Sequence, residues 1–362
     1  MNHRPRRRVG VKDVAREAGV SLGTVSNVLN RPEIVAEPTR TRVLSVIDSL
    51  GYVRAEGARL REAASRVLAV MVADLANPFY AALASGVEQA AREAGLSVMV
   101  CRSPRDPAEL TRHVTLFSSH LVRGVVLSSG EGIGGTVSAF RRTAIPFVVA
   151  DQIAPQPGAS SIGVDDVAGG RCAVRHLIER GHRSIVHLSG PDRLQQTRDR
   201  RRGALDAVAA AGLPPVSLRE LPCRDLTVSA GRDAGHRVLG LLPRPTAVFC
   251  ANDLLALGVM QALHEAELRV PDDFALVGYD DIEFAASAVT PLTSVRRPAA
   301  PMGHRAGQLL VADTASGAAL QPSHVVLQPE LVVRRSTAAT WRINQDFTRL
   351  SHGSSAGPAL RP

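Results

Sequence analysis

Residues 11–30, VKDVAREAGVSLGTVSNVLN, predict the architecture of the N-terminal part of the chain. Its first apolar residues recur at helical spacing and share one face of a predicted helix: Val11, Val14, Ala15 and Ala18. Gly19 is placed to end this helix, because glycine readily adopts the left-handed conformation found at helix C-termini.

A second helix is predicted after Ser21, whose hydroxyl can cap it. The buried face of this helix would consist of Val25, Val28 and Leu29. A third helix is expected after Pro38, with Val43, Ile47 and Leu50 on one face and Gly51 at its end. Two helices joined by a short turn containing glycine form the helix-turn-helix pattern, although any small three-helix bundle shows similar spacing.

The charge of the chain is concentrated in the same region. The 362 residues carry a formal net charge of +9, and residues 1–66 hold 13 Lys or Arg against 7 Asp or Glu. A basic N-terminal part on a nearly neutral body is typical of a phosphate-binding module, whereas a solvated basic tail would lack the helical pattern. At 45% hydrophobic and 21% charged, the chain has the composition of a globular protein of two or three domains.

The N-terminal residues also resemble a known family. VKDVAREAGVSLGTVSNVLN and TRTRVLSVIDSLGYVR, residues 39–54, are similar to the headpiece of the lactose-repressor (LacI/GalR) family. This resemblance implies that the second helix lies in the major groove of duplex DNA. The positions it assigns to base contacts are Leu22, Gly23 and Asn27.

These positions differ in what they can contact. Leu22 can touch a thymine methyl group, Asn27 can bond a base edge or a phosphate, and Gly23 can only allow close approach. Three short hydroxyl side chains are better suited to phosphates, which position a protein without specifying sequence: Ser21, Thr24 and Ser26.

The segment after Tyr52 corresponds to the hinge of the family. Relatives carry a short helix there that wedges a leucine into the minor groove, and Leu60 is the leucine available for this role. The segment is one residue shorter than the common family pattern, and Arg54 stands where proline is frequent, so Leu60 can be offset by one position.

From residue 67 the pattern changes to short apolar runs that alternate with helical segments. The predicted strands are 67–73, 96–101, 124–129, 145–151, 184–190, 246–251 and 274–279. The predicted helices between them include 80–94, 169–180, 200–211 and 254–267. This alternation predicts parallel α/β sheets, and about 270 residues of it favour two similar lobes.

Polar residues follow several of these strands, at the edge where α/β proteins bind ligands. They are Asp74, Asn77, Asp151, Asn252 and Asp253, and the aromatic pair Phe79 and Tyr80 lies next to Asn77. Carboxylates and an aromatic wall suit a small hydroxyl-rich ligand. Turn formation by Asn77 and helix capping by Asn252 and Asp253 are the structural alternatives.

The body resembles the sensor domain of the same family, which is similar to periplasmic sugar-binding proteins. The resemblance rests on DLANPFY (74–80), VDDVAGGRCAVRHLIERGHRSIVHLSGP (164–191), ANDLLALGVMQAL (251–263), VGYDDIEFA (277–285), TPLTSVRRP (290–298) and LVVRRST (331–337). The effector contacts it implies are Phe79, Tyr80, Asp151, Arg200 and Asp253. Arg198, Arg201 and Arg202 are alternatives to Arg200.

We therefore expect an all-α helix-turn-helix headpiece (1–53), a hinge (54–66), a two-lobed α/β periplasmic-binding-protein-like sensor domain with parallel sheets (67–340) and a flexible tail (341–362). The expected function is that of a transcriptional regulator, a repressor, that binds a pseudo-palindromic operator in duplex DNA as a homodimer or tetramer. A small-molecule effector bound between the lobes, a sugar by default although purine-binding relatives exist, would control operator affinity.

The sequence offers little support for other classes of protein. A solute-binding protein for transport would explain the body but not the headpiece. No catalytic residues, cofactor or metal site are expected, because nucleophile and acid–base patterns are absent and the four cysteines lack metal-ligand spacing. Neither a signal peptide nor a membrane span is expected, so the predicted location is the cytoplasm, away from any membrane.

Overall fold

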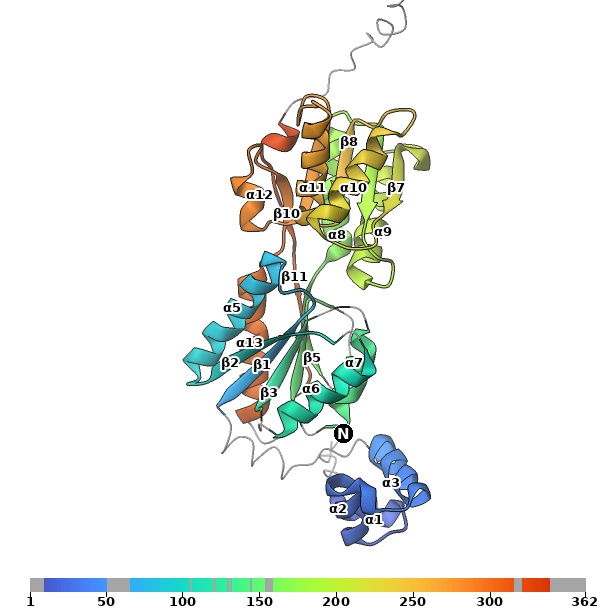
Figure 1. Cartoon of the computed structure of the whole chain (residues 1–362), viewed down its shortest axis with the longest axis vertical. Coiled ribbons are helices and arrows are strands. Elements are labelled where there is room, and N and C mark those ends of the chain that lie inside the picture. The colour runs from blue at the N-terminus through green and yellow to red at the C-terminus, as the bar shows by residue number, and fades with distance from the viewer. Residues whose placement is uncertain are drawn as a thin grey trace, which may run out of the picture. The chain divides into compact units, whose positions relative to one another are not determined.

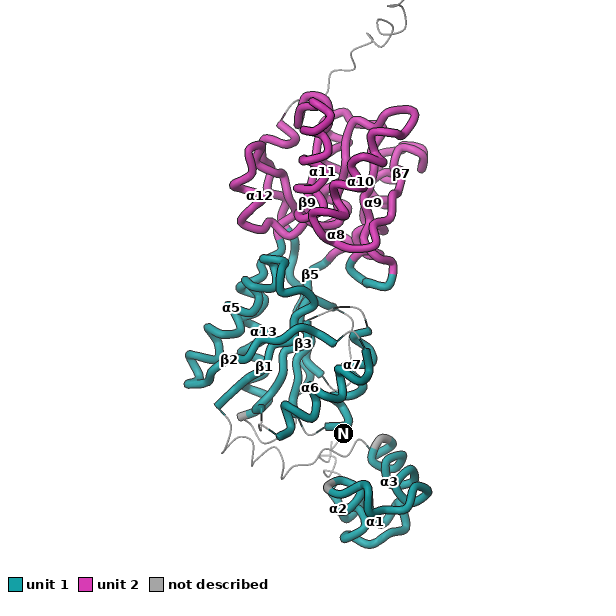
Figure 2. Tube along the Cα trace, in the orientation of Figure 1, with its two compact units in different colours: residues 1–165, 193–196, 297–329 teal, residues 166–192, 197–296, 330–362 magenta. Residues whose placement is uncertain are grey.

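A computed structural model describes residues 10–50, 66–104, 106–119, 122–128, 130, 132–143, 145–153, 159–315 and 321–338. The chain divides into two compact units, drawn in different colours in Figure 2. Unit 1 comprises residues 1–165, 193–196 and 297–329, and unit 2 comprises residues 166–192, 197–296 and 330–362. The chain therefore passes from one unit to the other several times.

The N-terminal helices confirm the helix-turn-helix prediction. They are α1 (Val11–Glu17), α2 (Leu22–Asn30), a short 3-10 helix (Pro32–Ile34) and α3 (Glu37–Leu50). Their shared core consists of Val14, Ala15, Ala18, Val25, Val28 and Val43. Pro38 lies in the first turn of α3, where a residue without an N–H group breaks no helical hydrogen bond.

Gly19 makes the sharp turn between α1 and α2. Its φ of 65° lies in the left-handed region that favours glycine, as the sequence predicted. The turn is closed by a hydrogen bond of 3.0 Å from the backbone N–H of Val20 to the carbonyl of Ala15. This geometry turns the chain within a few residues, so that the buried faces of α1 and α2 meet.

Unit 1 contains a six-stranded sheet in the order β11-β5-β4-β3-β1-β2, and all of its pairs are parallel (Figure 1). Its strands are β1 (Val67–Val72), β2 (Ser97–Arg102), β3 (Gly124–Ser128), β4 (Phe147–Ala150), β5 (Ser160–Val164) and β11 (His324–Leu327). Its helices are α5 (Pro78–Glu93), α6 (Pro107–Ser119), α7 (Ile133–Arg141) and α13 (Ala299–Ala315).

Helices α5 and α13 pack backbone against backbone. A Cβ atom at Gly86 would lie 2.0 Å from the carbonyl oxygen of Ala300, and one at Gly303 would lie 1.9 Å from that of Leu83. Only glycine permits such close approach at these two positions. The contact fixes the start of α5, which carries two of the predicted effector residues.

Unit 2 contains a second six-stranded sheet, in the order β12-β10-β9-β8-β6-β7. Its strands are β6 (Ile185–Ser189), β7 (Leu218–Pro222), β8 (Ala247–Cys250), β9 (Ala275–Asp280), β10 (Thr293–Arg296) and β12 (Glu330–Val332). Its pairs are parallel except for β10 with β12. The accompanying helices are α8 (Asp166–Glu179), α9 (Gln195–Ala210), α10 (Val228–Leu239), α11 (Asp253–Glu265), α12 (Glu283–Ser287) and the 3-10 helices Pro215–Ser217 and Arg335–Thr337.

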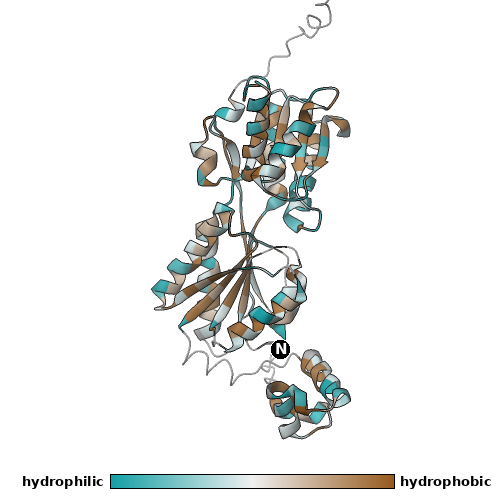
Figure 3. Cartoon of the chain, in the orientation of Figure 1, coloured by the Kyte–Doolittle hydropathy of each residue, from teal (hydrophilic) through white to brown (hydrophobic). Residues whose placement is uncertain are grey.

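All seven strands predicted from the sequence are present, with ends that differ from the prediction by at most two residues. Their apolar character is visible as brown strands in the sheets of Figure 3. The elements that the sequence did not predict are β5, β7, β10, β11, β12, α6, α7, α10, α12 and α13. The proposed hinge, apart from Arg66, and the proposed tail lie outside the described residues.

Candidate functional site

Helix α2 begins at a well-formed cap. The Oγ atom of Ser21 accepts a hydrogen bond of 3.0 Å from the backbone N–H of Thr24, and the two hydroxyl groups lie 2.9 Å apart. The structure thus confirms that Ser21 caps this helix. Val25 and Val28 are buried against the other two helices, which fixes which face of α2 points outward.

The outward face of α2 carries the residues predicted to contact DNA. Leu22 is 46% exposed although it is a large apolar side chain. Gly23, Ser26 and Asn27 are exposed as well, and Thr24 is half-buried. An exposed leucine with small polar neighbours at the start of a helix suits contact with base edges and phosphates in a major groove. Leu60, the predicted minor-groove wedge, lies outside the described residues.

The predicted effector residues of unit 1 come together at the carboxyl edge of its sheet. Asn77 caps α5 through its Oδ1 atom, which accepts a 3.0 Å hydrogen bond from the N–H of Phe79. The rings of Phe79 and Tyr80 meet edge to face, with centroids 5.1 Å apart. Asp151 follows β4 with a positive φ of 64° and is buried. The local structural role of Asn77 is therefore to cap α5, whereas the alternative that the sequence suggested was turn formation.

A residue that the sequence did not single out joins this group. The guanidinium of Arg297 forms a buried ion pair with Asp151, and its Cζ atom lies 3.7 Å from the centroid of the Phe79 ring. Gln196 donates a hydrogen bond of 3.0 Å from Nε2 to the second carboxylate oxygen of Asp151. The only signal in the sequence was the pair of arginines in TPLTSVRRP, Arg296 and Arg297.

In unit 2 the structure distinguishes Arg200 from its neighbours. Arg200 is buried, whereas Arg198, Arg201 and Arg202 are exposed. Its Nε atom donates to Oδ1 of Asp166 at 2.8 Å, and its Nη1 atom donates to the carbonyl of Ala251 at 2.5 Å. Its Cζ atom lies 3.8 Å from the centroid of the Tyr279 ring. These contacts hold the guanidinium at the carboxyl edge of β8 and β9.

Asp253 and Asn252 have different roles at the start of α11. Asn252 is the helix cap, because its Oδ1 atom accepts a hydrogen bond of 2.9 Å from the N–H of Leu255. Asp253 is 1% exposed, and its carboxylate accepts hydrogen bonds from Ser294 Oγ at 2.6 Å and from the N–H of Ile282 at 2.9 Å. Burial and the nearby charge of Asp280 raise the pKa of Asp253 well above its usual range.

Asp280 is a further residue of this site that the sequence prediction missed. It ends β9, is buried, and has a φ of 111°, which is unusual for a residue other than glycine. Strained backbone of this kind is concentrated at ligand sites. The signal was available in VGYDDIEFA, where two aspartates follow an apolar strand.

The strand β6 carries two buried polar side chains beside this edge. The ring of His187 stacks on Phe249 with centroids 4.7 Å apart, and its Nδ1 atom lies 3.2 Å from the Phe249 carbonyl. Burial lowers the pKa of His187 to about 4, so the ring is neutral at pH 7. The Nε2 atom of His187 and the hydroxyl of Ser189 have no hydrogen-bond partner among the described residues.

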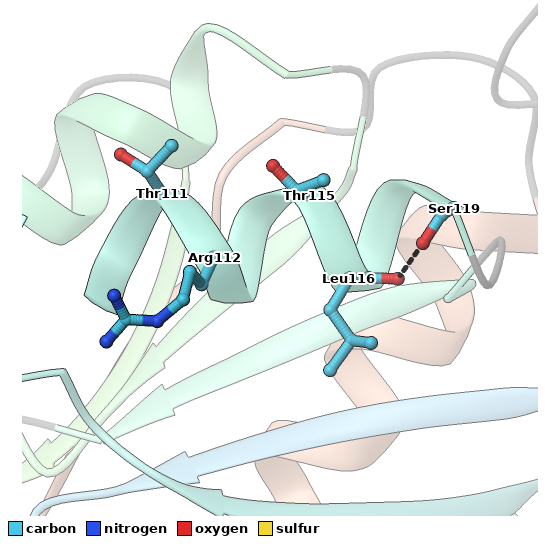
Figure 4. Close-up of a pocket in the computed structure, with 5 residues that line it drawn as sticks. All are labelled: Thr111, Arg112, Thr115, Leu116 and Ser119. Atoms are coloured by element: carbon cyan, nitrogen blue, oxygen red, sulfur yellow. Dashed lines mark hydrogen bonds between the residues drawn. The ribbon is translucent and has the colours of Figure 1, made fainter. Parts of the chain in front are cut away.

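The described residues were also searched for other pockets, metal-binding groups and membrane-spanning helices, and none of these indicates a second functional site. Figure 4 shows a depression on α6 lined by Thr111, Arg112, Thr115, Leu116 and Ser119. All five residues are exposed, so the depression is an open surface. Within the described ranges, no group of three or more His, Cys, Asp or Glu side chains is arranged to hold a metal ion. No helix in these ranges is both long and apolar enough to cross a membrane.

Comparison with known proteins agrees with the two-part architecture. Residues 10–55 match the family of bacterial regulatory proteins, lacI family, and residues 174–337 match the periplasmic binding protein-like domain. The ribose operon repressor of Escherichia coli K12 is 35% identical over 329 residues, which cover 90% of this chain and 99% of the repressor. The chain belongs to the LacI family. The regulator DegA of Bacillus subtilis is 32% identical over 338 residues, covering 91% of this chain and 98% of DegA.

Two solved structures of transcriptional regulators are similar to nearly the whole chain. The complex of the transcriptional regulator CelR with cellobiose has a TM-score of 0.69 and 32% identity, and covers 91% of this chain and 100% of CelR. The lac repressor dimer bound to operator and the anti-inducer ONPF has a TM-score of 0.66 and 29% identity, and covers 92% of this chain and 100% of the repressor.

The LacI-family chain is thus a DNA-binding transcriptional regulator with a helix-turn-helix headpiece and an effector-binding body. Residues 10–55 of this chain match the lacI family of bacterial regulatory proteins. A solute-binding protein for transport would not require this DNA-binding part. The individual contacts of Leu22, Asn27, Arg200 and Asp253 with DNA or effector stay predictions.

Proposed function

We propose that the protein represses transcription in the cytoplasm by binding a pseudo-palindromic operator as a homodimer, and that a sugar effector controls its operator affinity. A two-fold symmetric dimer presents two copies of α2 to the two halves of such a site. The proposed parts are the headpiece (1–53), the hinge (54–66), the effector-binding and dimerisation domain (67–340) and the tail (341–362). No catalytic role is proposed, and the relatives are regulators.

The observation that carries the DNA-binding half is the outward face of α2. Val25 and Val28 anchor the helix in the headpiece core, which leaves Leu22, Gly23 and Asn27 exposed to contact bases. Ser21, Thr24 and Ser26 are proposed to contact phosphates, and Leu60 is proposed to enter the minor groove. The lac repressor, a similar protein, is a dimer on its operator.

The proposal that the protein binds an effector is based on residues at the carboxyl edges of the two sheets. Five residues are proposed to bind or position the effector as the sequence suggested: Phe79, Tyr80, Asp151, Arg200 and Asp253. The structure adds Asp280 and Arg297 as neighbours in their respective units. A sugar suits this mixture of buried carboxylates, guanidinium groups and rings. Related structures hold cellobiose and ribose.

Selection of binding sites from random DNA duplexes by the full-length protein tests the DNA-binding half. We expect a two-fold symmetric consensus and an affinity that falls steeply with salt, because phosphate contacts release counterions. Recovery of duplexes without any sequence preference would contradict the proposal.

Thermal-shift screening with ribose and cellobiose, followed by operator binding in the presence of each hit, tests the effector half. A ligand that binds must also change operator affinity, since allosteric coupling between two sites is typically about 1–3 kcal/mol. If ligands bind but none of them changes operator affinity, the proposed control by an effector is contradicted.

A further inference from the structure

Unit 2 contains a network of ion pairs around Asp281, which directly follows β9. The carboxylate of Asp281 accepts a hydrogen bond of 2.8 Å from Nε of Arg296 and one of 2.6 Å from Nη1 of Arg334. Arg296 also donates from Nη1 to Glu330 at 3.1 Å, and Arg334 donates to the carbonyl of Leu292 at 2.8 Å. Each of the two arginines therefore joins Asp281 to a second part of the unit.

Arg296 and Glu330 lie where the chain passes between the units. The chain leaves unit 2 between residues 296 and 297, and it returns between residues 329 and 330. These two crossings start side by side within unit 2, because Arg296 in β10 and Glu330 in β12 are register partners. The Arg296–Glu330 ion pair thus links the two crossings to each other.

Asp281 holds β12 from both of its ends. At the start of the strand, Asp281 orients Arg296, which in turn bonds Glu330. Beyond the last residue of the strand, Asp281 bonds Arg334 directly. The ladder between β10 and β12 consists of three residue pairs, and a ladder this short depends on contacts outside its backbone hydrogen bonds.

The loop that carries Asp281 also holds Asp253. The N–H of Asp281 donates to the hydroxyl of Ser294 at 3.1 Å, and that hydroxyl donates to Oδ1 of Asp253 at 2.6 Å. The N–H of Ile282 donates to the other carboxylate oxygen at 2.9 Å. Asp281 has a φ of 55°, which surrounding contacts must maintain in a residue other than glycine. One residue is therefore bonded towards Asp253 through its backbone and towards the crossings through its side chain.

The members of the network differ in exposure. The side chains of Asp281 and Arg334 are 6% and 17% exposed, whereas those of Arg296 and Glu330 are 44% and 69% exposed. Removing one partner of a buried ion pair leaves the other charge uncompensated, while an exposed pair contributes little and is screened by salt. Loss of Asp281 should therefore loosen β12 more than loss of Glu330 does.

We infer that Asp281 is a positioning residue that transmits changes at Asp253 to both chain crossings, at 296/297 and at 329/330. The inference rests on the proposed effector role of Asp253. It goes beyond that role, because it names a residue through which the effector site would be energetically coupled to the chain segments that join the units. Contiguous hydrogen bonds and ion pairs are able to carry such coupling.

Hydrogen exchange of the full-length protein, measured by mass spectrometry of its peptides, tests the connection. In Asp281→Asn the amides of residues 330–332 should exchange at least ~5-fold faster than in the wild type, because both contacts that hold β12 are lost. Asparagine tolerates the positive φ at this position. Asp206→Asn, which breaks a half-exposed ion pair with Arg171 in the same unit, is the matched control. Wild-type exchange of residues 330–332 in Asp281→Asn overturns the inference.

A double-variant cycle tests transmission from Asp253. Asp253→Asn alone should change the exchange of residues 330–332 by ~2-fold or more, and in the Asp281→Asn background this effect should largely disappear. If Asp281 only supported the local fold, the two substitutions would act independently and their effects would multiply. Such independent effects, or no effect of Asp253→Asn on these amides, contradict the transmission.

Glu330→Gln keeps the inference testable if Asp281→Asn fails to fold, because it alters an exposed side chain. It should raise the exchange of residues 330–332 by ~2-fold and leave that of residues 281–283 unchanged. About 1 M NaCl should abolish the difference from the wild type, since salt screens an exposed pair. No difference at low salt, or one that persists at high salt, contradicts an ionic link between the crossings. These measurements require neither effector nor operator, so failure of the proposed function is distinguishable from failure of this inference.

Discussion

The hydroxyl of Ser294 donates a hydrogen bond of 2.6 Å to Oδ1 of Asp253, which lies 41 residues earlier in the chain. The N–H of Ile282 donates to the other carboxylate oxygen at 2.9 Å. These bonds hold the side chain in one orientation at the carboxyl edge of the unit 2 sheet. The pKa of Asp253 is nevertheless raised, because burial and Asp280 outweigh the two donors.

Asp253→Asn should separate stability from ligand binding. A carboxyl group with a raised folded pKa contributes stability at low pH that is lost as the pH rises through that pKa, and an amide has no charge to lose. We therefore expect the melting temperature of the variant not to share the part of the wild type's decline with rising pH that the ionisation of Asp253 causes. Effector affinity should fall by about 1.5–3 kcal/mol, the value of a charged hydrogen bond.

Thermal melts and calorimetric titration with the ligand found in the screen measure the two effects of Asp253→Asn. Asp272→Asn, at an exposed ion pair with Arg269, is the control for the substitution itself. Wild-type effector affinity in Asp253→Asn would show that Asp253 only supports the fold.

Asn27→Ala should relax sequence preference at one or two operator positions. Asn27 is exposed on the outward face of α2, where it can bond a base edge, and loss of such a bond costs roughly 1–3 kcal/mol. Selection from random duplexes measures the change, and Ser49→Ala, at an exposed position of α3, is the control. A uniform loss of affinity across all sequences would instead assign Asn27 to a phosphate.

Leu60→Ala should weaken operator binding and leave effector binding unchanged, because the proposed partner of Leu60 is a base step in the minor groove. Fluorescence anisotropy with the selected operator measures the first property, and calorimetry measures the second. Wild-type operator affinity in this variant would show that the shortened hinge uses another residue.

The stability of the protein should fall in mildly acidic solution. Burial lowers the pKa of both His182 and His187 to about 4, whereas the usual value is 6.5. Between these values the unfolded chain binds protons that the folded chain does not, so stability present above pH 6.5 is lost as the pH falls towards 4. Melting temperatures recorded from pH 7.5 to pH 4.5 should show the decline.

His187→Gln should reduce that decline, since the amide does not titrate. His264→Gln, at an exposed position of α11, is the matched control and should keep the wild-type dependence. If His187→Gln melts with the same pH dependence as the wild type, buried His187 does not contribute to acid sensitivity.

The sequence predicted the headpiece well, because its helices depend on residues that are close together in the chain. It did not predict contacts between residues that are far apart in the chain. Ser21, Gly19 and the apolar face of α2 act within a few residues of one another, so their pattern is visible in the chain. Arg297 and Asp151 form a pair only through the folding of unit 1, and neither position shows it in isolation. The resemblance to a family supplied Arg200, and burial then distinguished it from its three neighbours.

Two of the five missed strands have a physical explanation as well. β11 and β12 have four and three residues, and their side chains are exposed or only partly buried, so they lack the continuous apolar run of a central strand. Asp280 was passed over because sequence alone does not reveal its positive φ.

The repeated passage of the chain between its two units has a consequence for how the protein is made on the ribosome. Residues 166–192 and 197–296, which belong to unit 2, are synthesised before α13 and β11 of unit 1. Until those late elements emerge, α5 lacks the helix that packs against its glycine face, and β5 has an unpaired edge. The first sheet to begin is therefore completed only after residues 166–296 of unit 2 have been synthesised, and the nascent chain has to remain soluble with an open sheet edge until then.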